Sequence, residues 1–408
     1  MEPSSWSNWF GNVTCHPRLC IHPADEGELA DTIVAAGRAG DRVAIAGAGH
    51  SNVPLVATDG TLLDLDRMAG IASVDLEQMT ATVGAGTVIA ELGDALWDLG
   101  LGLINQGDID AQRIAGAVAT GTHGTGRELT SFSGAVVGGR LITADGSLRR
   151  FGPADPDLLD AARTSLGVLG AISELTLSVR EAYCVERTWL SLRWGEFEER
   201  WHELLHTNRH CTFFWLPQED SSAGFGIPPG EPDSILVKMM NPRPKDAPPS
   251  GSGDHSDPTP YIDRSYRVFP DEYGPDFAEL EYFIAQSDCL GAMAEVRELI
   301  RGHHPDQRYP VEVRFTAADP GWLSPAYERD SCVVSCGGSF REDYEPFLRD
   351  CDRILARFDG RPHWGKLGFA PEERLERLLP RLPDFRDLRR RLDPAGVFLG
   401  DWLKSLLA

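Results

Sequence analysis

The sequence lacks a long hydrophobic run. It also has few cysteines and fewer positive than negative charges. Its 408 residues contain no stretch close to the roughly 20 apolar residues that span a bilayer. Residues 1–6 show neither the basic nor the apolar region of a signal peptide. The 8 Cys include no CxxC pair, which excludes a disulfide scaffold and indicates mostly reduced, buried thiols. We therefore expect a cytoplasmic protein.

The charge balance excludes two classes of partner. Lys and Arg number 39 against 62 Asp and Glu, a formal net charge of −23, so the field of the protein repels nucleic acid and anionic membrane surfaces. Hydrophobic residues make up 42% and charged residues 25%, which is typical of a globular protein rather than a disordered one. At roughly 150 residues per domain, the length predicts two or three units.

The first part of the chain alternates short β-type runs with helical ones. We expect strands at 42–46, 79–83 and 135–143 and a helix at 88–99, which indicates an α+β or α/β unit. Of the 42 Gly, 18 lie within residues 47–146. Such density predicts a main chain pressed against a flat or phosphorylated ligand, although turns in a sheet would also use glycine.

A second domain follows the first. The stretch 241–260 is polar and rich in proline, so we predict a mobile surface loop that holds neither a helix nor a central strand. The last residues, 361–408, should form short helices that pack back on the first unit.

Two glycine-rich segments are candidates for ligand binding. The first, Gly47-Ala48-Gly49-His50-Ser51, follows a predicted strand, but it lacks the third glycine of a dinucleotide fingerprint, and a lone histidine is often structural. The second, residues 116–126, combines small residues with Thr hydroxyls and so offers the hydrogen-bond donors that a diphosphate needs.

Three further motifs carry ionisable groups. His202-Glu203-Leu204-Leu205-His206 matches the H-E-x-x-H pattern of zinc hydrolases, but no third ligand follows and a short match arises easily in a Glu-rich helix. In a strand, the segment Glu312-Val313-Arg314 places a carboxylate and a guanidinium on one face. These two groups could belong to a functional site or form an ion pair on the surface. Residues 363–366 form a compact cluster that includes His363 and Lys366. The cluster could belong to a site, or Lys366 could simply pack the apolar part of its side chain beside a buried Trp.

Taken together and in order, these segments resemble the vanillyl-alcohol-oxidase-type flavoproteins. The likeness is greatest to their alditol oxidase and aldonolactone oxidase branch and covers nearly the whole chain. Other matching segments are residues 8–12, 143–146, 317–319, 322–327, 361–366 and 392–396.

The resemblance implies an α+β fold of two domains. Residues 1–180 would bind FAD through two α+β subdomains, 181–360 would form an antiparallel-sheet cap over the flavin, and 361–408 would complete the active site. It implies FAD bonded through its 8α carbon to His50, and no metal. It assigns other cofactor contacts to Ala46, Gly47, Ala48, Gly49, Ser51, Gly107, Asp108, Ile109, Gly116, Ala119, Thr120, Gly121, Thr122, His123, Gly124, Ile172, His363 and Lys366.

The resemblance also implies the reacting centre. Glu312 would accept a hydrogen bond from the reacting hydroxyl and orient it, and Arg314 and Lys366 would be the nearby cations. The sequence does not tell which residue acts as the base and which only orients the hydroxyl. Asp108, Ser335 and Gly337 differ from the residues of the alditol oxidase branch, so we expect them to set substrate choice.

The expected function is oxidation of a polyol or sugar-like alcohol, with O2 as acceptor and H2O2 as product, by a monomer. Alternatives are a dehydrogenase or aldonolactone oxidase, a specialised enzyme for an amino-sugar, cyclitol or nucleoside-like alcohol, a flavin-binding protein without turnover, and a zinc hydrolase. The specialised enzyme is expected if an amine of its substrate pairs with Asp108. Arg314, Lys366 or Arg113 could supply that positive charge instead.

Overall fold

A small parallel sheet opens the N-terminal unit. The computed structural model describes residues 5–271, 274 and 276–408, and its three-stranded sheet has the order β3-β5-β4. These strands are β3 (Leu19–Ile21), β4 (Val43–Ala46) and β5 (Thr61–Asp64), preceded by a hairpin of β1 (Trp6–Ser7) and β2 (Thr14–Cys15). Helix α1 (Glu26–Arg38) joins β3 to β4. It begins at Asp25, whose carboxylate accepts hydrogen bonds from the first free amides.

The second sheet of this unit has six strands, ordered β10-β9-β11-β7-β6 with β8 also paired to β11. The strands are β6 (Ile71–Asp75), β7 (Thr80–Gly84), β8 (Leu101–Leu103), β9 (Val136–Ile142), β10 (Leu148–Phe151) and β11 (Ala171–Glu181). Its helices are α2 (Ile89–Asp98), α3 (Ile114–Thr120) and α4 (Pro156–Arg163). The strands and the helix expected from the sequence are all present, within one or two residues of their predicted ends.

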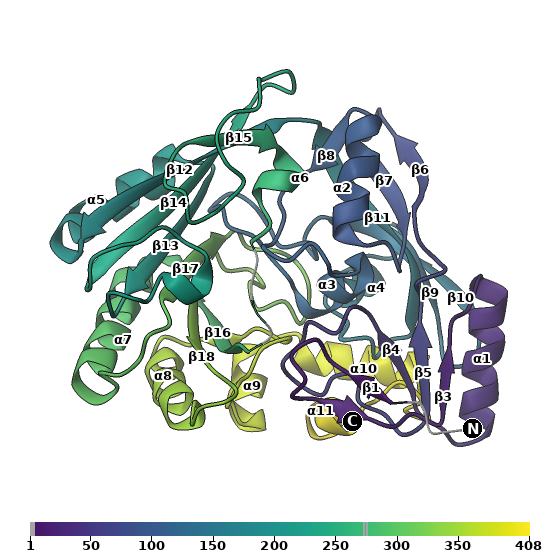
Figure 1. Ribbon diagram of the computed structural model, residues 1–408. Coiled ribbons are helices and arrows are strands. Elements are labelled where there is room, and N and C mark those ends of the chain that lie inside the picture. The colour runs from purple at the N-terminus through teal and green to yellow at the C-terminus, as the bar shows by residue number, and fades with distance from the viewer. Residues whose placement is uncertain (1–4, 272–273, 275) are drawn as a thin grey trace.

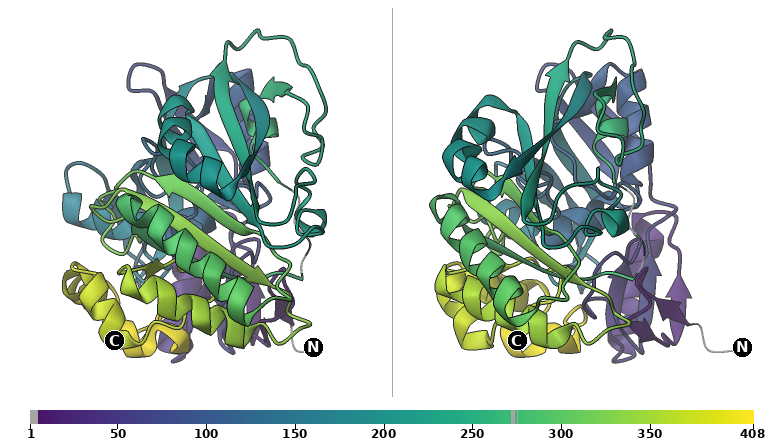
Figure 2. Two further views of the ribbon diagram at one scale, coloured as in Figure 1. Left: turned by 90° about the vertical axis from the view of Figure 1, so that its left-hand side faces the viewer. Right: turned by 60° about the vertical axis from the view of Figure 1, so that its left-hand side comes forward.

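The cap is an eight-stranded antiparallel sheet of order β15-β12-β14-β13-β17-β18-β16-β19. Its strands are β12 (Cys184–Arg193), β13 (His210–Leu216), β14 (Ser234–Arg243), β15 (Tyr261–Arg264), β16 (Ala278–Ala285), β17 (Val311–Thr316), β18 (Ser331–Gly338) and β19 (Arg361–Pro362). Helices α5 (Trp194–Thr207), α7 (Cys289–His303) and α8 (Glu345–Arg357) lie over one face of this sheet, in front of it in the left view of Figure 2, while α6 (Ser265–Val268) contacts β12 and β15. The other face therefore remains for the N-terminal unit (Figure 1).

The prediction for residues 241–243 is wrong. They end β14 and pair with β12, with Pro242 opposite Val185. Proline fits because β13 pairs with β14 only up to Met240, so one side of the strand is open at Pro242 and needs no amide donor there. Beyond Arg243 the chain forms the expected loop, which Arg187 anchors by donating hydrogen bonds to the carbonyls of Ser252 and Asp254.

The C-terminal segment returns to the N-terminal core. Helices α10 (Leu382–Leu392) and α11 (Asp401–Leu407) supply buried side chains to the same hydrophobic cluster as α1 and β11, and α9 (Glu372–Leu378) packs the partly buried Leu375 against it. The turn between α10 and α11 is held by the buried Asp393, whose carboxylate accepts hydrogen bonds from the amides of Val397 and Phe398 at 2.8 Å each. The segment that leads into these helices carries His363 and Lys366.

Two expectations from composition concern the cysteines and the membrane. All eight cysteines are free thiols, and six of them are buried. In the described part of the chain, no helix is both long and apolar enough to cross a membrane.

The packing of α10 yields a stability prediction. Phe385 is fully buried in the N-terminal core, so Phe385→Ala should lower the free energy of unfolding by about 3–5 kcal/mol. Urea unfolding followed by circular dichroism measures this loss. Trp402→Ala is the control, because Trp402 is 40% exposed and its loss should cost much less. Equal effects of the two substitutions would contradict the place of α10 in the core.

Candidate active site

The loop after β4 is held in place by the N-terminal hairpin. Gly49 has a φ of +75° and lies so close to the main chain of Asn8 and Trp9 that a Cβ would approach both within 3.2 Å. The Asn8 side chain donates a hydrogen bond to the carbonyl of Ser51 at 2.9 Å, and the Trp9 ring stacks on His50 with centroids 5.1 Å apart. The hairpin and the glycine together fix the direction of the His50 imidazole.

His50 is neutral at physiological pH. Burial, reinforced by the positive charge of Lys366, lowers the pKa of His50 to about 4. Its Nδ1 atom is buried and has no hydrogen-bond partner among the described residues. The imidazole therefore offers a free nitrogen to a ligand.

A groove continues from this loop along α3. Small residues line it, which lets a flat ligand approach the main chain, and a Cβ added to Gly116 would meet no atom within 4 Å. The cofactor residues predicted from the sequence that line this groove are Ala46, Gly47, Ala48, Gly49, His50, Ser51, Gly116, Ala119, Thr120 and Ile172.

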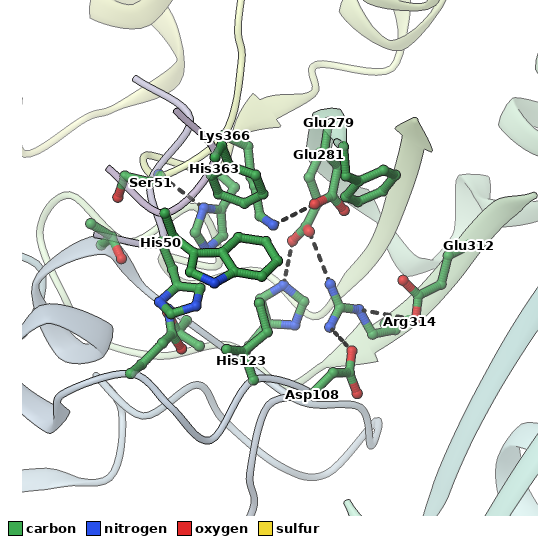
Figure 3. A pocket seen from close by; sticks show the side chains of 18 of the residues that line it. His50, Ser51, Asp108, His123, Glu279, Glu281, Glu312, Arg314, His363 and Lys366 are labelled. Atoms are coloured by element: carbon green, nitrogen blue, oxygen red, sulfur yellow. Dashed lines mark hydrogen bonds and ion pairs between the residues drawn. The ribbon is translucent and has the colours of Figure 1, made fainter. Parts of the chain in front are cut away.

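At its cap end the groove meets a polar pocket (Figure 3). Strand alternation explains how the cap supplies it: on β17, Glu312 and Arg314 face the pocket, while Val311, Val313 and Phe315 pack into the cap core. The pocket is also lined by predicted residues from other segments, namely His50, Ser51, Asp108, Ile109, Thr120, Thr122, His123, His363 and Lys366.

Arg314 is the centre of the pocket. Its Nη1 lies 2.7 Å from Asp108 Oδ2, its Nη2 lies 2.9 Å from Glu281 Oε2, and its Nε lies 3.7 Å from Glu312 Oε1. Burial alone would lower the pKa of Arg314, but these three carboxylates outweigh it and hold the pKa well above its usual value. The guanidinium is therefore a fixed positive charge.

Lys366 is the second cation. Its ammonium pairs with the carboxylate of Glu279, which also accepts a hydrogen bond from the Ser335 hydroxyl. Burial lowers the pKa of Lys366, but the charges of Glu279 and Glu281 more than compensate and keep the amine protonated.

The buried side chains of His123 and Glu281 form a hydrogen bond. His123 Nδ1 lies 2.7 Å from the carbonyl oxygen of Gly124, which can only accept, so Nδ1 carries a hydrogen. His123 Nε2 lies 2.6 Å from Glu281 Oε1, and this contact also needs a hydrogen, held by either partner. Burial raises the pKa of Glu281, but the charges of Arg314 and His123 outweigh it and hold the pKa well below its usual value. Glu281 is therefore ionised in this contact.

Comparison with known proteins identifies the family. Residues 17–152 match the family described as FAD binding domain, and residues 250–406 match the family described as D-arabinono-1,4-lactone oxidase. The chain is 34% identical to L-gulono-1,4-lactone dehydrogenase of Mycobacterium tuberculosis, over 98% of this chain and 99% of that protein. It is 33% identical to alditol oxidase of a Streptomyces species, over 98% of each. The chain belongs to the vanillyl-alcohol-oxidase-type family of FAD-dependent sugar and aldonolactone oxidoreductases.

Solved structures agree with this family at the level of the fold. A solvent-stable cholesterol oxidase superposes with a TM-score of 0.82 at 17% identity, covering 100% of this chain and 98% of that one. The resemblance inferred from the sequence is thereby confirmed, both for the family and for the fold of an FAD-binding domain with an antiparallel-sheet cap.

The groove of this oxidoreductase fits FAD. Besides His50 Nδ1, two buried polar atoms of its wall, Gln112 Oε1 and Ser165 Oγ, lack hydrogen-bond partners among the described residues. Unpaired polar atoms beside small residues are what a nucleotide cofactor would satisfy. Neither Gln112 nor Ser165 was predicted, because both lie outside the glycine-rich motifs.

Three predicted cofactor residues act through the backbone and do not line the cavities. Gly121 ends α3 with a φ of +80°. A Cβ on Gly107 would lie 3.0 Å from the carbonyl oxygen of His123, and a Cβ on Gly124 would lie 2.9 Å from the carbonyl carbon of Gln106. These two glycines let the loop around Asp108 pack against the loop around His123.

Three expectations about specificity need correction. Gly337, which we expected to set substrate choice, does not line the pocket, because the ring of Phe277 occupies the space in front of it and itself lines the pocket. Arg113 does not face Asp108, because it pairs with Asp64 on the wall of the groove. Ser335 does not line the pocket, although it contacts the lining residue Glu279.

Glu279 and Glu281 were missed by the sequence analysis. They alternate along β16 with the core residues Leu280 and Tyr282, the same pattern that marked Glu312 and Arg314. A search for paired charges at alternate positions of an apolar strand would have found them.

The H-E-x-x-H motif does not assemble a metal site. His202 and His206 are exposed on α5, and His206 Nδ1 bonds to the carbonyl of His202 at 2.6 Å. Among the described residues, three potential ligands converge at His123, Glu281 and His363 and at His22, Asp64 and Asp66, neither of which includes this motif.

We expect His202→Ala to leave the enzyme unchanged. Because the imidazole is exposed and does not line the pocket, the rate of flavin reduction should stay within about twofold of wild type. Metal analysis should find zinc at background in both proteins. Stoichiometric zinc that disappears in His202→Ala would contradict this assignment.

Proposed function

We propose that this chain is an FAD-linked oxidase that oxidises a CH–OH group of a polyol or sugar-like substrate and passes the electrons to O2, producing H2O2. The observation that carries this proposal is the pair of buried cations, Arg314 and Lys366, beside the His50 loop. Relatives named alditol oxidase, L-gulono-1,4-lactone dehydrogenase and L-gulonolactone oxidase support the substrate class.

FAD held in the groove supplies the acceptor for the hydride. The protein must bind the alcohol, orient it and take up its hydroxyl proton. Arg314 and Lys366 favour the negative charge that develops during the reaction, and their positions are fixed by the carboxylates of Asp108, Glu281 and Glu279.

Glu312 is the proton acceptor in this proposal. Burial, the main cause, raises its pKa to about 8, although Arg314 opposes the shift. A base with a pKa close to the working pH can both accept a proton and release it again. Glu281 cannot take this role, because Arg314 and His123 already occupy both of its oxygens.

We further propose that the flavin is bonded through its 8α carbon to His50. A neutral imidazole is a nucleophile, and the pKa of about 4 keeps His50 neutral at physiological pH. The unpaired Nδ1 atom is the nitrogen available for the bond. The bond would prevent loss of the cofactor.

The covalent bond predicts that acid-precipitated protein stays yellow and that His50→Ala does not. Absorbance of the pellet and the supernatant near 450 nm measures the distribution of the flavin. His16→Ala is the control, because His16 is exposed and should keep the bond. Release of all flavin from the wild-type protein would disprove the linkage.

The reaction itself is tested by anaerobic mixing with xylitol, sorbitol and L-gulono-1,4-lactone. We expect an alcohol to bleach the flavin and air to restore it with release of H2O2. Arg314→Ala and Lys366→Ala should each slow bleaching about 10²-fold, the effect of removing one electrostatic contact to the transition state. Lys404→Ala, an exposed lysine of α11, is the control.

Two outcomes would argue against this proposal. Bleaching without reoxidation by O2 would indicate a dehydrogenase with another acceptor. Bleaching rates within a few-fold of wild type in both Arg314→Ala and Lys366→Ala would show that these cations serve only the structure.

A further inference from the structure

Among the carboxylates of the pocket, Glu312 has the longest contact to a cation, 3.7 Å from its Oε1 atom to Arg314 Nε. The other carboxylates are paired more closely: Glu279 with Lys366, Asp108 with Arg314 at 2.7 Å, and Glu281 with Arg314 at 2.9 Å. Lys238 pairs with Asp271, which also contacts His255, and lies 4.0 Å from Asp108. Arg314 therefore serves two closer carboxylates besides Glu312.

Charges of both signs surround Glu312. Arg314 and Lys238 are positive and favour its ionised form, whereas Asp108 and Glu279 are negative and oppose it. The two carboxylates therefore offset part of the attraction of the two cations.

Glu312 is also short of hydrogen bonds. Its side chain is 6% exposed and lines the pocket, and its Oε1 atom has no donor partner among the described residues. A buried carboxylate oxygen without a donor is costly. A ligand that supplies a donor with a positive charge would be selected over one that supplies neither.

We propose that the substrate is an amino alcohol whose ammonium group, on the carbon next to the reacting CH–OH, pairs with Glu312. This inference rests on the proposed oxidation of an alcohol and narrows its substrate class to amino polyols or amino sugars. A carboxylate has two oxygens, so Glu312 can bind the ammonium through one and the hydroxyl through the other.

The ammonium also helps the reaction. It keeps Glu312 ionised, and only the ionised carboxylate can receive the hydroxyl proton. A neutral polyol lacks this effect, because its hydroxyl groups bring no charge to the site. Neutral sugar alcohols should therefore bind less well than their amino counterparts.

Three matched compounds test the proposal on the holoenzyme: 2-amino-2-deoxy-D-glucitol, D-glucitol and the N-acetyl derivative of the first. They differ only at C2, where they carry an ammonium, a hydroxyl and a neutral amide. We expect kcat/KM for flavin reduction to be roughly tenfold or more higher for the amine than for D-glucitol, the scale of one charge-assisted hydrogen bond. The amide should not share the gain.

The ratio of the two kcat/KM values separates specificity from catalysis. Glu312→Gln should slow both substrates, yet it should reduce the ratio of amine to D-glucitol to about one, because the amide of Gln carries no charge. Lys404→Ala should leave both the rates and the ratio at their wild-type values. A ratio that survives in Glu312→Gln would overturn the pairing.

The dependence on pH adds an independent readout. Glu312 has a pKa of about 8, so it is mostly protonated at pH 6. Between pH 6 and 8, KM for the amine should fall by up to about tenfold per pH unit, while KM for D-glucitol should not fall. The amine itself stays protonated over this range.

The outcomes are distinguishable. If D-glucitol or the amide equals or exceeds the amine, this inference fails while the proposed alcohol oxidation stands. If no alcohol reduces the flavin, the proposed function fails and the inference with it.

Discussion

The buried guanidinium of Arg314 is the interaction on which the pocket depends. It is contributed by the cap strand β17 and contacts Asp108, which comes from the N-terminal unit, and Glu281, which comes from β16 of the cap. Since a carboxylate left alone in a buried site is costly, the two units are constrained to meet where these charges pair. The imidazole of His123, also from the N-terminal unit, contacts the other oxygen of Glu281. The FAD-binding unit and the cap are thereby joined at the reacting centre.

Backbone contacts beside these ion pairs make the junction rigid. The amide of Gly126 donates to the carbonyl of Phe315 at 2.8 Å, and the hydroxyl of Thr125 donates to the carbonyl of Cys211 at 2.6 Å. The same segment that provides small residues to the cofactor groove thus docks on two cap strands. The cofactor groove and the polar pocket consequently have a fixed relation, as the proposed hydride transfer requires.

The pocket combines a common framework with an individual charge balance. The framework consists of the His50 loop, the α3 groove and the two cations, and the whole-length relatives place it in a family of sugar and lactone oxidoreductases. The balance comes from carboxylates, and Glu312 is the one whose contact to a cation is longest. Phe277 adds an apolar wall in front of Gly337. The pocket is therefore distinguished by its charges more than by an enlarged cavity.

The sequence by itself determined the family, the α+β fold and the principal motifs, because these depend on local patterns. The segment from Gly47 to Ser51 and the alternation of Glu312 and Arg314 are readable from neighbouring residues. The H-E-x-x-H motif is equally local, and among the described residues no group of three potential ligands includes it.

Only the tertiary structure decided which charges pair. Arg113 contacts Asp64 and not Asp108, and Pro242 lies in a strand because its neighbour on one side ends early. Glu279 and Lys366 are 87 positions apart in the chain. Such pairings depend on the strand order of the cap and on the return of the C-terminal segment to the N-terminal core. Their energies are set by burial and by distances in the folded chain, and a local sequence pattern encodes neither.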